Sequence, residues 1–312
     1  MLPAMTLKQL RCLCEVVRQG MHLSHAATAM HTSQPGVSRQ ILSLERELGI
    51  VILERSGNRI LGLTPMGAKI ASYAERTLRE ADNLRMCRDE ARDEASGALV
   101  VATNHTHARY TLPRVIDAFS RRYPGVRLQF WQGSRDEIFR WVDDGDADLA
   151  IGTDCDAELG NLALLPFGTF HRIVVTPPRH KLLRIHEPGL EDIAAYPIIT
   201  YGSRIYGNWK FRHLFEARQL HPNIVFSAVD SDVSKTYVAL GLGIAILPHI
   251  TFEAAEDSKL RAIDARHLFG KETMHVGLNR RQFHRGYVFD FMAMLAPDLL
   301  SRRRVERALA AA

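Results

Sequence analysis

The first 62 residues carry apolar side chains at the three- and four-residue spacing of amphipathic helices. This spacing predicts three helices, at 7–17, 23–30 and 34–48. Ser33 is a favourable N-cap for the third helix, and Pro35 suits its first turn, where the missing N–H costs nothing. The second and third helices are therefore joined by a very short connection, as in a helix-turn-helix.

Beyond Gly49, which ends the third helix, the pattern changes twice. Two short apolar runs, 51–53 and 60–63, flank a polar turn and predict a β-hairpin wing. Residues 64–93 then read as one long helix, whose apolar residues form a narrow seam of Ile70, Ala74, Leu78, Ala81 and Leu84. Such a seam suits pairing with a second copy of the chain. The alternative is a helix packed on its own domain.

After Ser96-Gly97, apolar strands alternate with amphipathic helices as far as about residue 300. This alternation predicts an α/β fold with largely parallel sheets, arranged as two small lobes around a cleft. We therefore expect four parts. They are a winged helix-turn-helix domain at 1–63, a linker and dimerisation helix at 64–95, an effector-binding domain at 96–300 with lobe I at about 96–168 and 268–300 and lobe II at about 169–267, and a basic tail at 301–312.

The amino-acid composition only mildly favours a polyanionic partner. The 312 residues are 46% hydrophobic and 24% charged, which is ordinary for a globular protein, and the net charge of +5 slightly favours a polyanionic partner. Four scattered cysteines are too few for a disulfide framework, so we expect reduced thiols. The charged N-terminus does not suit a signal peptide, and the longest uncharged run, 236–252, is shorter than the roughly 20 residues of a membrane span. These features predict a cytoplasmic protein.

The outer face of the third predicted helix is rich in side chains that can bind base edges and phosphates, and acidic residues come only at its far end. Residues 1–62 hold seven Lys/Arg and four Glu, a net charge of +3. The pattern favours DNA binding, with the predicted helix in the major groove and the wing on phosphate or in the minor groove. The assigned residues are Ser33, Gln34, Pro35, Ser38, Arg39, Gln40, Arg55 and Arg59. For each arginine alone, a solvated surface position is the alternative.

The same region resembles the LysR-type transcriptional regulators. The resemblance rests on Ala26-Ala27, on the unbroken run 32–41, on Leu44-Glu45-Arg46-Glu47-Leu48-Gly49, and on Leu63-Thr64-Pro65-Met66-Gly67. It implies a winged helix-turn-helix, a dimerising linker helix and a two-lobed sensor like a periplasmic binding protein. It also implies promoter DNA and RNA polymerase as partners, and a homodimer that assembles further into a homotetramer.

A polar loop follows the first strand of the predicted sensor, where an open α/β sheet tends to bind ligands. Exposed N–H groups at the following helix start, with the hydroxyls of Thr103 and Thr106, suit an anion. The alternative is that these residues only cap the helix.

The chain also resembles the CysB-like subfamily, on stretches that include 106–110, 132–134, 148–153, 173–177 and 230–243. That resemblance implies control of sulfur assimilation by a sulfate-like anion, an acetylated serine or an organosulfur compound, with no other cofactor. It implies an effector site formed by Thr103, Asn104, His105, Thr106, His107, Gln132, Gly133, Ser134, Thr153, Phe170, Thr200, Tyr206 and Asp232.

Three of these positions depart from the subfamily pattern. Asn104 replaces a threonine, His107 a glutamine and Phe170 a tryptophan. Asn104 still offers donors to an anion. A bound anion would raise the pKa of His107, so we expect pH-sensitive effector binding.

An enzyme is the chief alternative, and we expect none. Gly241-Leu242-Gly243 lacks the third glycine of a dinucleotide-binding fingerprint and precedes a strand. His105 and His107 could ligate a metal, but no cysteine or carboxylate stands beside them in the sequence, so we expect no metal site. A transport binding protein would not carry the N-terminal head, and an architectural DNA binder would have no use for 97–300. The arginines of the tail are expected to lie on a solvated helix end.

Overall fold

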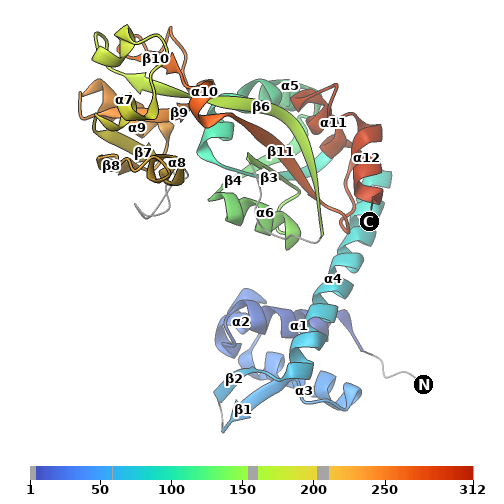
Figure 1. Cartoon of the computed structure of the whole chain (residues 1–312). Helices are drawn as coiled ribbons and strands as arrows, with labels where there is room; N and C mark the ends of the chain where they lie inside the picture. The colour runs from blue at the N-terminus through green and yellow to red at the C-terminus, as the bar shows by residue number, and fades with distance from the viewer. Residues whose placement is uncertain (1–4, 58, 154–160, 202–210, 312) are drawn as a thin grey trace. The chain divides into compact units, whose positions relative to one another are not determined.

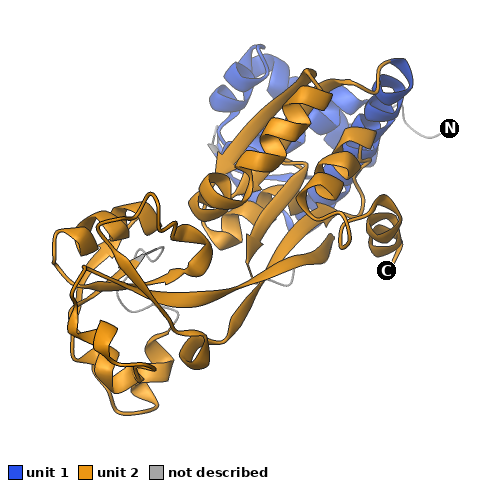
Figure 2. Cartoon of the chain, turned by 90° about the horizontal axis from the view of Figure 1, so that it is seen from above, with its two compact units in different colours: residues 1–92 blue, residues 93–312 orange. Residues whose placement is uncertain are grey.

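The computed structural model describes residues 5–311, apart from residues 58, 154–160 and 202–210. The side chains of Arg59 and Tyr201 are likewise outside the description. Figure 2 shows two compact units, Met1–Arg92 and Asp93–Ala312, here called unit 1 and unit 2. Each unit has its own hydrophobic core.

Unit 1 is a three-helix head with a two-stranded wing and a long final helix (Figure 1). Its elements are α1 (Leu7–Arg18), α2 (Leu23–Ala29), α3 (Gln34–Leu48), β1 (Leu53–Ser56), β2 (Arg59–Leu63) and α4 (Pro65–Arg92). The expected caps are present, since the Ser33 hydroxyl accepts from the N–H of Gly36 and Gly49 ends α3 in the left-handed conformation. The local signals in the sequence thus place each helix correctly.

The seam predicted on α4 is divided between two environments. Ile70, Ala74 and Leu78 pack into the core of unit 1 together with residues of α1 and α3, whereas Leu84 is 73% exposed. The first half of the seam therefore follows the alternative of packing on its own domain. In the second half the side chain of Leu84 is exposed, and pairing with a second copy stays a prediction.

Unit 2 is built on a nine-stranded mixed sheet in the order β4-β3-β5-β11-β6-β9-β7-β8, with β10 paired to β6. Its strands are β3 (Ser96–Thr103), β4 (Gly125–Gln132), β5 (Leu149–Thr153), β6 (Leu162–Thr176), β7 (Ile198–Tyr201), β8 (Ile224–Ala228), β9 (Ile244–Pro248), β10 (Arg261–Asp264) and β11 (Lys271–Asn279). Its α-helices are α5 (Pro113–Arg122), α6 (Arg135–Asp143), α7 (Leu190–Ala194), α8 (Arg212–Glu216), α9 (Ser231–Ala239), α10 (Arg266–Phe269), α11 (Gly286–Leu295) and α12 (Arg302–Ala310).

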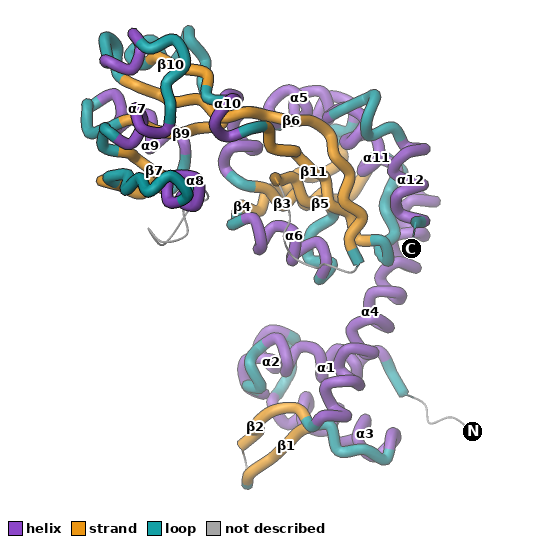
Figure 3. The backbone as a smooth tube through the Cα atoms, in the orientation of Figure 1, coloured by secondary structure: helices purple, strands orange, loops and turns teal. Residues whose placement is uncertain are grey.

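The long strands β6 and β11 run between the two lobes of unit 2 (Figure 3). Lobe I contains β3, β4 and β5 with the adjoining parts of β6 and β11, and lobe II contains β7, β8, β9 and β10 with the other end of β6. Within each lobe three strands are parallel, but β6 and β11 are antiparallel to their neighbours. The expectation of largely parallel sheets is corrected here, because two direct crossings between lobes require strands that run in opposite directions.

The basic C-terminal segment forms α12 and belongs to lobe I. Val305 is fully buried in the lobe I core, and the Arg280 guanidinium donates to the carbonyl oxygens of Ala308, Leu309 and Ala311. The arginines at 302, 303, 304 and 307 lie on the exposed side of this helix. The expected solvated helix end is therefore a packed element with a basic outer surface.

Among the described residues, no helix combines the length and apolar character needed to cross a membrane.

Three of the four cysteines lie in the described part of the chain. Cys12, Cys14 and Cys87 are free thiols, and burial raises the pKa of Cys14 to about 12. The fourth, Cys155, lies outside the described residues.

Candidate functional sites

The start of α3 presents a polar surface on a firmly capped helix. Ser33, Gln34, Pro35 and Arg39 are exposed, while Ser38 and Gln40 are half-buried. The opposite face of α3 is fixed by three fully buried residues, Val37, Ile41 and Leu44. The first turn of α3 holds no acidic residue, so its N–H groups and its side chains favour the same anionic partner.

The wing is tied to α3 through Glu45. One oxygen of this carboxylate accepts from the backbone N–H groups of Ile52 and Leu53, and the other pairs with Arg55 at 3.3 Å. Arg55 remains exposed at the edge of the wing. The Arg59 side chain, also predicted to contact DNA, lies outside the description. Glu45 thus holds the wing at a fixed position beside the exposed face of α3.

The junction between the wing and α4 depends on a close backbone approach. The Thr64 hydroxyl donates to the Val51 carbonyl and accepts from the N–H of Gly67, both at 2.8 Å. A Cβ atom at Gly67 would lie 2.9 Å from the carbonyl carbon of Ile52 and nearer still to its oxygen. Only glycine therefore fits at this position without a shift of the backbone.

In lobe I, three predicted effector residues lie at the carboxyl ends of adjacent parallel strands. Thr103 ends β3, Gln132 ends β4 and Thr153 ends β5, and the backbone N–H of Gly133 donates to the Thr103 carbonyl. The fold therefore brings these segments together at the edge where open α/β sheets bind ligands. Ser134 beside them serves α6, because its hydroxyl and N–H both pair with the Glu137 carboxylate.

The loop after β3 has already used several of its polar groups within the protein. The Thr103 hydroxyl is buried and donates to the Ile151 carbonyl, and the Asn104 side-chain oxygen accepts from the N–H of His107. Asn104 therefore caps the start of the following helix, which is the alternative role that the sequence left open for this loop. Thr106 remains half-buried at the surface of this loop.

His107 differs most from its expected role. Its imidazole is 1% exposed, lies 3.1 Å from the Thr111 hydroxyl and packs edge-on to Phe167 in the lobe I core. Burial lowers the pKa of His107 to about 4, so the ring is neutral near pH 7. The irregular helical turn over His107–Thr111 directs this ring inward, whereas the sequence placed it in the effector site; the effect of a bound anion on its pKa stays a prediction.

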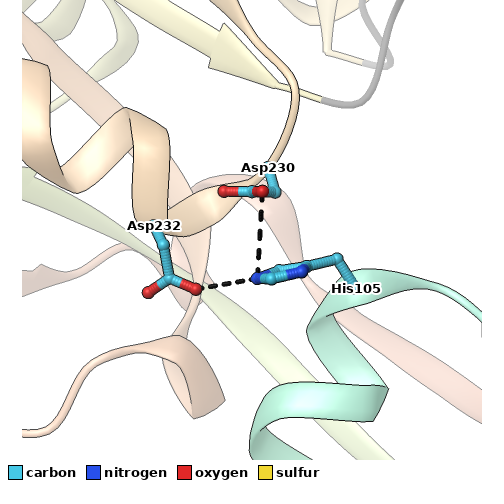
Figure 4. Close-up of side chains that lie close together, drawn as sticks. All are labelled: His105, Asp230 and Asp232. Carbon is cyan, nitrogen blue, oxygen red and sulfur yellow. Dashed lines mark hydrogen bonds and ion pairs between the residues drawn. The ribbon is translucent and has the colours of Figure 1, made fainter.

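Lobe II meets the same loop through the start of α9. Nε2 of His105 lies 2.8 Å from Oδ2 of Asp232 and 3.9 Å from Oδ2 of Asp230 (Figure 4). Because α9 follows β8, the carboxyl end of β8 faces the carboxyl end of β3 across this contact. Strand β7 is parallel to β8, so Thr200 near its end belongs to the same edge of lobe II.

A charged network surrounds Asp232. Its Oδ1 accepts a hydrogen bond from the Tyr110 hydroxyl and lies 3.3 Å from Nζ of Lys235, which also pairs with Asp257. Partial burial opposes the charged form of Asp232, but the bonds from Tyr110 and His105 and the charge of Lys235 outweigh it and lower its pKa. The ionised Asp232 of lobe II is therefore hydrogen-bonded to two side chains of lobe I, His105 and Tyr110.

Part of this network was not predicted from the sequence. Asp230, Tyr110 and Lys235 were not assigned to a site, and a carboxylate at a helix start, such as Asp230, is typical of an N-cap. Asp230 does cap α9, since its Oδ1 accepts from the N–H of Val233. The buried ring of Phe170 lies under the Arg172 guanidinium, away from this network's described contacts. Tyr206 lies outside the described residues.

A winged helix-turn-helix joined by a long helix to a two-lobed α/β unit defines a class of DNA-binding regulators with a built-in sensor. Residues 7–68 match the model of the bacterial regulatory helix-turn-helix protein, lysR family, and residues 92–299 match that of the LysR substrate binding domain. The chain belongs to the LysR family of transcriptional regulators.

Relatives within this family match nearly the whole chain. It is 41% identical over 305 residues to the HTH-type transcriptional regulator CysB of Burkholderia cenocepacia, covering 98% of this chain and 97% of the relative. It is also 41% identical over 295 residues to the regulator SsuR of the same organism, covering 95% and 96%. Unit 2 resembles the crystal structure of the cofactor-binding domain of the Cbl transcriptional regulator, with a TM-score of 0.64, 38% identity, and coverage of 70% of this chain and 96% of that domain.

Proposed function

We propose that this regulator reads promoter DNA with the start of α3 in the major groove and the wing on the adjacent backbone or minor groove. The observation that carries the proposal is the exposed polar surface of the first two turns of α3, which includes Gln34 and Arg39, together with the absence of acidic residues from the first turn. In a helix-turn-helix, side chains at the N-terminal end of the second helix contact the base edges. The family relationship supports the same orientation.

Arg39 and Arg46 form a matched pair for testing this proposal. Both are exposed, and each donates from Nε to the backbone carbonyl four residues earlier, so their local structures are alike. Arg39→Ala should weaken specific promoter binding about 10- to 100-fold, the cost of one base contact, in gel shifts at fixed salt. Arg46→Ala at the far end of α3 should change it little. Undiminished sequence-selective binding by Arg39→Ala would remove the basis of the proposal.

Unit 2 is proposed to bind a small anionic or zwitterionic effector related to sulfur metabolism, and the genes controlled are proposed to serve sulfur assimilation. The carboxyl-terminal ends of β3 and β8 face each other across the contact of His105 with Asp232, and the half-buried Thr106 follows His105 in the same loop. The likeness to the cofactor-binding domain of Cbl supports a small-molecule site in this unit. The identity with regulators named CysB and SsuR supports the sulfur assignment.

Effector identity can be tested by stabilisation of the folded protein. A ligand that binds only the native state raises the melting temperature in proportion to its affinity and concentration. We expect a shift with one or more of sulfate, thiosulfate, O-acetylserine, N-acetylserine and sulfonates. Absence of a shift with all of these, alongside intact DNA binding, would contradict the sulfur assignment and leave the DNA-reading proposal standing.

The regulatory step is proposed to be a change of assembly. Two copies pair along the exposed second half of α4, and further contacts through unit 2 complete a tetramer in the cytoplasm. An effector shifts this assembly only by its differential affinity for two arrangements of the lobes. The shift changes the spacing of the heads, and with it the bend of the promoter and the access of RNA polymerase.

A further inference from the structure

Three potential metal ligands from two lobes converge at the contact between the β3–α5 loop and α9. Nε2 of His105 and one carboxylate oxygen each of Asp230 and Asp232 lie within 4.8 Å of one another. Figure 4 shows the imidazole edge directed at both carboxylates. We propose that His105, Asp230 and Asp232 bind a divalent transition-metal ion such as Zn²⁺, which joins lobe I to lobe II. No metal site was expected from the sequence, because the carboxylates that lie near His105 in the fold are far from it in the sequence; Asp232 is 127 positions away.

Each carboxylate is held by its other oxygen. Oδ1 of Asp230 accepts from the N–H of Val233 at 2.9 Å, so Oδ2 is left for His105. Oδ1 of Asp232 is bound by the Tyr110 hydroxyl and Lys235, which leaves Oδ2 on the same side. Metal ligands in proteins are commonly oriented by such secondary hydrogen bonds. The two carboxylates are therefore fixed in an arrangement that a metal ion can use.

The charge balance also fits a divalent cation. The network contains the carboxylates of Asp230, Asp232 and Asp257 and the ammonium of Lys235, which gives a charge of −2 when His105 is neutral. A dication would neutralise this charge, and it would replace the direct hydrogen bond between His105 and Asp232.

The ligand set selects among metals. One imidazole nitrogen and two carboxylate oxygens are ligands of Zn²⁺ and its first-row neighbours, and three protein ligands leave a fourth position for water or an effector group. Mg²⁺ and Ca²⁺ prefer six or more oxygen ligands. The side chains of His105 and Asp232 are both 37% exposed, so an ion has access from solvent.

Occupancy would affect the sensor through the position of His105. This residue stands between Asn104 and Thr106 in the proposed effector loop, so an ion that ties His105 to α9 would hold the loop against lobe II. The coupling of metal to effector rests on the proposed function of unit 2. Binding of the metal itself does not, and it can be measured without DNA or effector.

The test is calorimetric titration of the full-length, chelator-treated chain with Zn²⁺, and with Mg²⁺ in parallel. The wild-type chain should bind one more Zn²⁺ than His105→Ala, and Mg²⁺ should give no comparable heat. Asp230→Asn and Asp232→Asn, which preserve side-chain shape, should each weaken this site at least about 10-fold, and Tyr110→Phe about 10-fold through loss of orientation. Zn²⁺ bound by the His22–His25 pair in unit 1 is present in both chains, so subtracting the stoichiometry of His105→Ala from that of the wild type removes it.

His171→Ala provides the matched control. His171 also faces a carboxylate of lobe II, Asp264, at 3.8 Å, but it is outside the group of three ligands. This variant should keep the wild-type stoichiometry and affinity. Equal Zn²⁺ binding by wild-type, His105→Ala and Asp232→Asn chains, each folded by circular dichroism, would overturn the proposal and reduce the contact to a hydrogen-bonded link between lobes.

Discussion

The start of α3 and the loop after β3 are both short polar segments that lead into a helix, but they differ in what their side chains contact. In α3, Ser33 closes the cap, and Gln34 and Arg39 remain exposed over a buried apolar face. In the loop, Thr103 and His107 are buried, and their polar groups contact the protein. A polar segment at a helix start can thus face outward or serve the interior, with the same residue types.

The start of α3 and the loop after β3 differ because they face different surroundings. A surface that meets DNA gains most when its side chains are exposed and its backbone is rigid, because ordering them at the moment of binding costs free energy. The loop after β3 instead faces lobe II, and His105 already spans the gap to Asp232. If the proposed effector site is correct, an effector there would compete with these bonds and so would change the arrangement of the lobes.

The largest expected effect concerns the rigid support of α3. Gly67→Ala should lower the free energy of unfolding of unit 1 by about 3 kcal/mol, because the new Cβ would collide with the Ile52 backbone. Gly62→Ala on β2 is the control, since a Cβ there has no neighbour within 4 Å. Urea unfolding followed by far-ultraviolet circular dichroism measures both. Equal midpoints for the two variants would show that the Ile52 backbone yields easily and that this junction does not depend on glycine.

The second expected effect is a loss of stability at low pH that comes from the buried His107 in the loop after β3. Below pH 6.5 the unfolded chain protonates His107, but the folded chain resists protonation down to its pKa of about 4, so stability falls as pH falls through this window. Between pH 7 and pH 5 the folded unit 2 should lose about 2 kcal/mol that His107→Gln does not lose. Because all three tryptophans lie in unit 2, their fluorescence follows its unfolding.

The comparison with the variant is essential here, because burial also lowers the pKa of His284 and gives a pH dependence of the same sign. Only the difference between wild type and His107→Gln reports His107. An identical pH dependence in the two chains would place this imidazole in contact with water, and the loop would then resemble the exposed start of α3.

A third test asks whether any part of the loop remains available to a ligand. Thr106→Ala should weaken effector binding about 10-fold, because it removes one hydroxyl from a partly buried polar contact. DNA affinity without effector should stay within twofold, since Thr106 belongs to unit 2. Thermal shift and gel shift measure the two. Loss of DNA affinity in Thr106→Ala, with effector binding retained, would show that the loop is structural throughout.

Sequence reasoning succeeded where the determining contacts are local. Ser33, Gly49 and Thr64 act within a few residues of their positions, and they mark the start and end of α3 and the start of α4. It failed where distant segments meet. Pro166 and Gly168 interrupt the apolar pattern of β6. The residues around His105 do not point to Asp232, which only the family resemblance assigned to the same site. The inward direction of His107 depends on an irregular helical turn that residue spacing does not specify.

The smallest expected effect tests the cap that the exposed surface of α3 depends on. The Ser33 hydroxyl accepts from the N–H of Gly36 at 3.2 Å, and Ser33→Ala should cost about 1 kcal/mol of unit 1 stability in urea unfolding. Ser33→Asp should restore it, because aspartate also caps helices, yet its charge should weaken binding to the phosphate backbone. Ser33→Asp would thus keep the stability of unit 1 while lowering its affinity for DNA. If Ser33→Asp bound promoter fragments as tightly as the wild type at low salt, the start of α3 would lie away from the duplex, and its exposure would have another purpose.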